Sequence, residues 1–165
     1  RRRADVVIHR QDPTALVTAT FRRIRQERMA DVPLPPLEVE AVGFRRWNGH
    51  WLGVLITPWA MSLMLLPGAA EGWELPGDNE KRAVAFPSGN YAFLAGTEEG
   101  LGEYQSCSLI SPVAHFPDQQ TARLTAEAAL FALLQEAAKA VESEKPALSR
   151  RGFLTGRVDR KAGDA

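Results

Sequence analysis

Cysteine is almost absent from this chain of 165 residues, and its scarcity excludes two common kinds of site. Cys107 is the single cysteine, so neither an internal disulfide nor a cluster of thiolate metal ligands can form within one chain. The three histidines, His9, His50 and His115, lack the short spacing of a zinc site. The sequence therefore predicts no resident metal and no cofactor.

Cys107 leaves two chemical alternatives open. His50 or His115 could serve as its base in a thiol-dependent enzyme, and ligands shared between two copies of the chain could make a metal carrier. An activated thiol usually lies at a helix N-terminus or in a strained turn. Cys107 instead falls in a predicted strand, where cysteine acts as a small apolar residue. The sequence thus favours a chain without catalytic residues.

Net charge is absent as well, since 20 basic residues balance 20 acidic ones. The total charge gives no reason to expect binding to nucleic acid. The distribution is uneven, however: residues 1–28 carry eight arginines against three acids, and residues 145–165 carry six bases against two. An acidic body with basic ends predicts ends that fold back on the body or bind an acidic partner.

A long apolar run is also missing. The residues from Trp51 to Ala70 include no charge, and about 20 apolar residues would span a bilayer. Pro58, Pro67 and Gly68 interrupt this stretch, so two buried strands explain it better than a membrane helix. Glycine loops of the phosphate-binding type are absent too. We expect no membrane insertion.

The residues that are present predict helices at both ends of a run of strands. Asp12 and Pro13 can open a helix that ends near Met29. Asn48 and Gly49 favour the positive φ angles of a hairpin turn. The strand candidates are 37–41, 50–57, 61–66, 82–86, 90–96 and 103–111.

The second helix is predicted from Gln119 to about Val141, after Pro117 and Asp118. Its predicted buried stripe consists of Leu124, Ala128, Phe131, Leu134, Ala138 and Val141. The order helix, strands, helix predicts an α+β fold: a single domain with an antiparallel sheet of about six strands, and an N-terminal and a long C-terminal helix packed on one face. We expect this domain to cover residues 1–145, with disorder allowed for 1–11, and residues 146–165 to form a flexible basic tail.

Candidate partner-binding residues come from two places. Four tryptophans lie within 27 residues of one another, and two methionines lie between the last two. Tryptophan and methionine together suit adaptable apolar surfaces. The contact residues predicted here are Trp59, Met61 and Met64. The alternative for each tryptophan is packing in the core or in an aromatic pair across the hairpin.

The second place is the segment Ser149-Arg150-Arg151-Gly152-Phe153-Leu154, which has the form of a twin-arginine export signal. A working signal continues with roughly 7–15 apolar residues, whereas polar and charged residues follow here. The segment cannot export the protein. We hypothesise that Arg150, Arg151, Phe153 and Leu154 mimic such a signal and occupy a site on this chain or on a partner. The alternative is a basic tail that pairs with the acidic body.

Three separated blocks resemble one known family. They are Trp47-Asn-Gly-His-Trp-Leu-Gly-Val-Leu-Ile-Thr-Pro-Trp59, then Met-Leu-Leu-Pro-Gly68, and Tyr104-Gln-Ser-Cys-Ser-Leu-Ile-Ser-Pro112. Each is similar to the HybE family of NiFe-hydrogenase assembly chaperones, and residues 150–156 resemble the closing segment of that family. The resemblance covers about residues 12–158.

This resemblance implies a cytoplasmic maturation factor that is not an enzyme and has no catalytic residues to carry over. Its implied partners are the precursors of the hydrogenase small subunit, which bears a twin-arginine signal, and of the large subunit. Its implied role is to delay export until the metal centres are in place and the subunits have joined. Some relatives carry a rubredoxin domain with four cysteines, and these 165 residues contain no such module.

Overall fold

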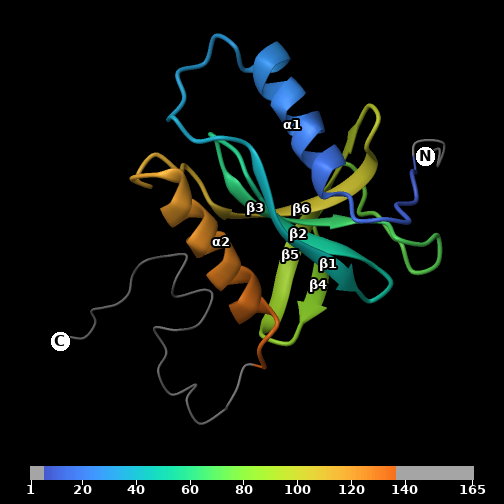
Figure 1. The fold of residues 1–165 in the computed structure, drawn as a ribbon. Helices are drawn as coiled ribbons and strands as arrows, with labels where there is room; N and C mark the ends of the chain where they lie inside the picture. The colour runs from blue at the N-terminus through green and yellow to red at the C-terminus, as the bar shows by residue number, and fades with distance from the viewer. Residues whose placement is uncertain (1–5, 137–165) are drawn as a thin grey trace.

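The computed structural model describes residues 6–136, which form one layer of sheet between two helices (Figure 1). Six antiparallel strands follow the first helix and precede the second. This confirms the α+β class and the six-stranded sheet. The elements are α1 (Thr14–Arg28), β1 (Glu40–Trp47), β2 (His50–Ile56), β3 (Met61–Leu66), β4 (Arg82–Phe86), β5 (Gly89–Glu98), β6 (Gly102–Ile110) and α2 (Gln119–Leu133).

The strand order in the sheet is β1-β2-β3-β6-β5-β4. Trp47 pairs with His50 across a two-residue turn in which Asn48 and Gly49 have φ values of 51° and 84°. This turn is the predicted hairpin. The chain then crosses from β3 to β4 at the far edge of the sheet. From there β5 pairs with β4, and β6 pairs with β5 on one side and with β3 on the other.

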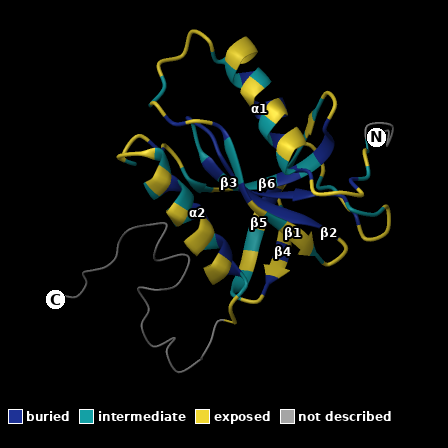
Figure 2. Cartoon of the chain, viewed as in Figure 1, coloured by how far each residue is buried: buried dark blue, intermediate teal, exposed yellow. Residues whose placement is uncertain are grey.

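The two helices lie on opposite faces of the sheet, so the prediction that both pack on one face is wrong (Figure 1). Alternate residues of β2 contribute to two separate cores. Leu52 and Val54 pack with α2, whereas Trp51 and Leu55 pack with α1. Every residue of β2 is buried as a result (Figure 2). A strand that is apolar on both faces needs cover on both, and one helix supplies each cover.

We name the two cores after the helices. The α1-side core consists of Val17, Phe21, Ile24, Val39, Trp51, Leu55, Met64, Leu66 and Leu101. The α2-side core is larger; its members from the helix are Ala122, Ala126, Leu130 and Leu133, and those from the sheet include Val42, Leu52, Val54, Ile56, Met61, Leu63, Leu65 and Phe93. Both cores share β2 and β3.

The buried stripe of α2 differs from the predicted one. Ala122, Ala126, Leu130 and Leu133 face the sheet, whereas Leu124 and Phe131 of the predicted stripe are exposed. Close packing between α2 and β1 explains which side of the helix faces the sheet. A Cβ added to Gly43 of β1 would lie 2.7 Å from Leu130 Cδ2. Only small or well-fitted side chains fit between α2 and β1 at that distance. The helix also ends at Leu133, before the predicted Val141, and Ala138 and Val141 lie outside the described residues.

Residues 6–11 are ordered against the α1-side core, so the disorder that the sequence allowed for residues 1–11 does not hold for this part. The indole Nε1 of Trp51 donates a hydrogen bond of 2.8 Å to the His9 carbonyl. His9 Nε2 donates in turn to the Leu101 carbonyl at 3.1 Å. Burial lowers the pKa of His9, because a charged imidazolium loses hydration there.

Sheet curvature brings the two edge strands together at one end. Trp47 at the end of β1 stacks on Phe86 at the end of β4, with ring centroids 4.4 Å apart and an interplanar angle of 21°. Phe86 also makes an edge contact with Tyr91 and lies 6.0 Å from the Phe93 ring. Aromatic contacts of this kind add stability beyond the area they bury. They close the α2-side core where the helix ends.

Candidate partner-binding surfaces

The predicted methionines are not surface residues. Met61 and Met64 are 0% and 1% exposed, and they belong to the α2-side and α1-side cores respectively. Side chains on opposite faces of β3 cannot meet one partner, so their assignment as contact residues is wrong. The apolar run 61–66 looked like a binding segment because it lies between tryptophans, yet helices on both faces of the sheet cover it.

Trp59 is half-buried in the turn between β2 and β3, where it packs against the α1-side core. Thr57 shapes this turn: its Oγ1 accepts hydrogen bonds from the Trp59 and Ala60 amides at 3.3 and 3.0 Å. Ser111 Oγ donates to the Trp59 carbonyl at 3.5 Å. The part of Trp59 that is accessible remains a predicted contact.

The other tryptophans serve the two cores. Trp51 is buried with the Arg46 guanidinium 4.4 Å from its ring centroid, and Trp73 is buried with its Nε1 donating to Glu103 Oε1 at 3.1 Å. Trp47 stacks on Phe86 as described above. This agrees with the core packing expected for them.

A surface that the sequence did not predict lies on α2. Leu124 is 54% exposed and Phe131 is 67% exposed, and the exposed Ala128 lies between them. The three residues have the spacing i, i+4, i+7, so they form one stripe along the helix. We call Leu124, Ala128 and Phe131 the outer face of α2. An apolar stripe that continues along an exposed helix face is a candidate surface for a partner.

Polar contacts fix α2 against the sheet and hold this face outward. Arg123 Nε lies 2.6 Å from Glu40 Oε2, and Gln119 Nε2 donates to the other carboxylate oxygen at 2.8 Å. Partial burial acts to raise the pKa of Glu40, but these hydrogen bonds outweigh it and hold the pKa below its ordinary value. At the other end, the Ser88 amide donates to the Leu133 carbonyl at 3.3 Å. Both ends of the helix are therefore anchored.

The charge beside the outer face is negative. Glu127 is exposed one turn before Phe131, and Glu136 is exposed just after the helix. Arg123, the basic residue of the helix, is engaged by Glu40. An apolar stripe with carboxylates at its margin suits a segment that combines apolar and basic residues.

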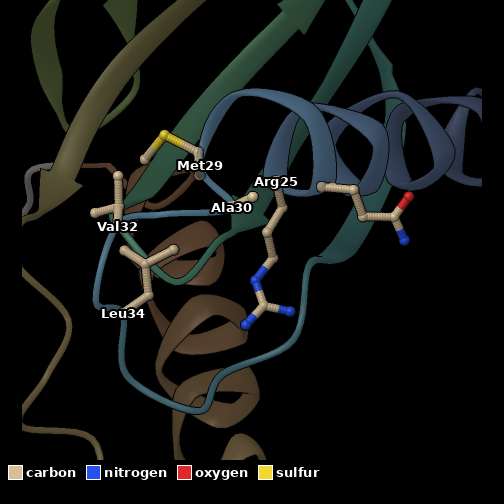
Figure 3. Close-up of a pocket in the computed structure, with 6 residues that line it drawn as sticks. Arg25, Met29, Ala30, Val32 and Leu34 are labelled. Atoms are coloured by element: carbon tan, nitrogen blue, oxygen red, sulfur yellow. The ribbon is translucent and has the colours of Figure 1, made fainter.

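A second surface is a shallow cleft of about 320 Å³ at the end of α1. Met29, Val32 and Leu34 gather there around the turn that leaves the helix, and Arg25 extends along its rim (Figure 3). Val32 is 44% exposed. The charged residue in its lining is Arg25, in contrast to the acidic margin of α2.

Catalytic alternatives gain no support from the position of Cys107. Cys107 on β6 pairs with Leu63 on β3, and Leu63 pairs with Val54 on β2. His50 begins β2 four residues from Val54, which is about 13 Å along a strand. His115 stacks on Phe116, 4.5 Å away, in the loop before α2. The structure therefore does not bring Cys107 and His50 together.

The described residues contain neither a cluster of metal ligands nor a membrane-spanning helix. Within residues 6–136, no three side chains of the histidine, cysteine, aspartate or glutamate type are placed to hold a metal ion. In the same part of the chain, neither helix has the length and apolar character needed to cross a membrane. The predicted contact residues Arg150, Arg151, Phe153 and Leu154 lie outside the described residues.

Comparison with known proteins supplies the family. A family model described as NiFe-hydrogenase assembly, chaperone, HybE matches residues 12–156. The chain is 37% identical to the hydrogenase expression/formation protein HupJ of Bradyrhizobium diazoefficiens, over 90% of each protein. It is 43% identical to the probable rubredoxin HupJ of Rhodobacter capsulatus, over 74% of this chain and 44% of that longer protein. The solution structure of HybE from Escherichia coli superposes with a TM-score of 0.64 and 30% identity, over 78% of this chain and 81% of that one.

Proposed function

This chain belongs to the HybE family of NiFe-hydrogenase assembly chaperones, and from that premise we propose that it binds hydrogenase subunit precursors in the cytoplasm and delays their export until maturation is complete. The precursors are the small subunit, with its twin-arginine signal, and the large subunit. The proposed role is binding, with no chemical step.

The outer face of α2 is the observation that carries this proposal. Leu124 and Phe131 expose apolar area on a helix whose other side is fully packed and anchored. An export signal combines a pair of arginines with an apolar run. Its apolar residues fit the outer face, and its arginines fit the carboxylates of Glu127 and Glu136.

Delay of export then follows from mass action. A signal or an unfinished subunit held by this protein is withdrawn from the pool that the export machinery can use. Completion of the metal centres and joining of the subunits remove the surface that the chaperone holds, so the complex dissociates. No energy source is needed for such a cycle, because each step is a change in relative affinity.

Binding of each precursor to variants of the full chain tests the proposal. We expect Leu124→Gln with Phe131→Gln to weaken precursor binding by about tenfold or more, because the pair removes apolar contact from the centre of the surface. The matched control is Leu94→Gln, which changes a leucine that is 41% exposed on β5. Cys107→Ser, which removes the single thiol, is expected to bind like the wild type.

The two precursors are measured separately by titration calorimetry, and the small subunit is measured with and without its signal. Loss of affinity on removing the signal identifies the bound segment. The proposal is wrong if neither precursor binds the wild-type chain, or if the outer-face pair and Leu94→Gln have equal effects. Loss of hydrogenase maturation with Cys107→Ser would support thiol chemistry instead.

A further inference from the structure

The outer face of α2 has a second candidate occupant within the same chain. We propose that residues 148–154 fold back and dock on Leu124, Ala128 and Phe131, so that this chain covers its own binding surface when no partner is present. The docking itself does not depend on the proposed function.

The chemistry of the segment matches that of the face. Leu148, Phe153 and Leu154 offer three large apolar side chains, and Arg150 and Arg151 lie between them in the sequence. Leu124 and Phe131 offer exposed apolar area, and Glu127 and Glu136 offer carboxylates. Apolar contact supplies the affinity, and the arginine–carboxylate pairs fix the direction in which the segment lies.

The length of the connection allows this contact. About a dozen residues separate residue 136 from Leu148, and a chain of that length spans up to about 40 Å. Helix α2 has 15 residues and is therefore about 22 Å long. Residues 148–154 can consequently reach any point along the outer face, including its far end at Leu124.

Covalent connection also makes a weak contact sufficient. A segment joined by a short linker acts at an effective concentration of about a millimolar. A dissociation constant near that value for the separate segment would already leave about half of the chains docked. The area of two or three exposed apolar side chains is enough for an affinity of this order.

The arginine pair gives this contact a consequence for regulation. Residues 149–154 have the form of the first part of an export signal, so the segment and a precursor signal would compete for the same face. Competition makes the chaperone selective, because a partner must bind more tightly than the internal segment. This consequence rests on the proposed function.

A nitroxide label in the full chain tests the docking. The label is attached to Ala147→Cys in a Cys107→Ser background, and it broadens the NMR signals of amides that lie near it. We expect broadening at amides around Leu124 and Phe131, and none around Leu94 on β5. Leu124→Ser with Phe131→Ser should lower the equilibrium constant for docking by about tenfold, equivalent to about 1.4 kcal/mol.

Three controls separate the explanations. Leu94→Ser should leave the broadening unchanged, and Phe153→Ser with Leu154→Ser should remove it. A mixture of labelled chains with isotope-enriched unlabelled chains should show no broadening, since broadening there would mean contact between copies and would overturn the proposal. Persistence of the broadening in the Leu124→Ser, Phe131→Ser chain, with a folded spectrum, would also overturn it.

A final arm distinguishes docking from the proposed function. Addition of a peptide with the small-subunit signal sequence should release the label if the two compete. Broadening that persists at saturating peptide would refute competition and leave the docking in place. Docking that is absent, together with precursor binding that depends on Leu124 and Phe131, would refute the inference and leave the proposed function in place.

Discussion

At the scale of single residues, the close approach of α2 to β1 limits which side chain β1 can carry at position 43. Gly43 has a φ of +69°, and Leu130 of α2 lies against the position where its Cβ would be. Gly49, in the β1–β2 turn, has a φ of +84° and nothing within 4 Å of that position. The two glycines therefore share a backbone requirement and differ in contact with the helix.

Gly43→Ala should accordingly cost more than Gly49→Ala. The backbone conformation alone costs about 1–2 kcal/mol for a residue with a Cβ. At Gly43 the displaced Leu130 adds about 1–3 kcal/mol. Urea unfolding of the two variants measures the difference, and equal losses would show that α2 does not approach β1 as closely as described.

Buried histidines make the stability depend on pH. His50 is buried beside Trp73, and its Nδ1 accepts a hydrogen bond from the Gly68 amide at 3.1 Å. Burial lowers the pKa of His50, with the positive charges of Arg46 and Arg82 acting in the same direction, and burial lowers the pKa of His9 as well. Both residues therefore prefer the neutral form in the folded protein.

The direction of the effect follows from proton binding. Below the ordinary histidine pKa of about 6.5 the unfolded chain binds more protons than the folded one, so stability is lost as the pH falls. We expect the free energy of unfolding to decrease between about pH 7 and pH 5. His50→Gln, whose side-chain oxygen can still accept from the Gly68 amide, should reduce this slope, and an unchanged slope would exclude His50 as a cause.

At the scale of elements, the two sides of α2 perform different tasks. Sequence periodicity identified a helix here correctly, and Asp118 caps it by accepting from the Thr121 amide at 2.8 Å. The same periodicity chose the wrong side, because it favours the larger apolar residues. The sheet instead requires small residues at Ala122 and Ala126, which leaves Phe131 outside. Steric fit against β1 is a tertiary property that no single-helix pattern contains.

Substitution of two adjacent residues of α2 can show that one side of the helix is packed in the core and the other is exposed. Leu130→Ala should cost about 2–5 kcal/mol, since it leaves a cavity in the α2-side core. Phe131→Ala should change stability by less than about 1 kcal/mol, because its ring is mostly exposed. Thermal or urea unfolding of the two variants provides the comparison. A large loss for Phe131→Ala alone would mean that the helix is rotated relative to this description.

At the scale of the whole molecule, β2 and β3 join the two cores into one unit. Each strand contributes alternate side chains to both faces, so neither helix can leave without exposing a core that the sheet shares. The sequence predicted two buried strands between Trp51 and Ala70, which agrees with the inner positions of β2 and β3 in the sheet. The placement of the two helices on opposite faces was not predicted, because the order of elements along a chain does not specify which face of the sheet each helix covers.

We therefore expect a single cooperative unfolding transition. Trp51 reports on the α1-side core and Trp73 on the α2-side core. In variants that retain one of these tryptophans and have phenylalanine in place of the others, fluorescence and far-UV circular dichroism should give the same midpoint within each variant. Separate midpoints would mean that one helix and its core unfold independently.

The stacking of Trp47 on Phe86 concerns the hydrogen-bonding edges of the sheet. β1 and β4 are the first and last strands in the order, and such strands normally offer unpaired amide and carbonyl groups to other chains. Here the rings draw the ends of the two edge strands toward each other, as in a barrel that is closed on one side only. Strand addition by a second molecule is hindered at that end. At that end, the edges of this sheet are less open to the exposed strands of other, incompletely folded chains.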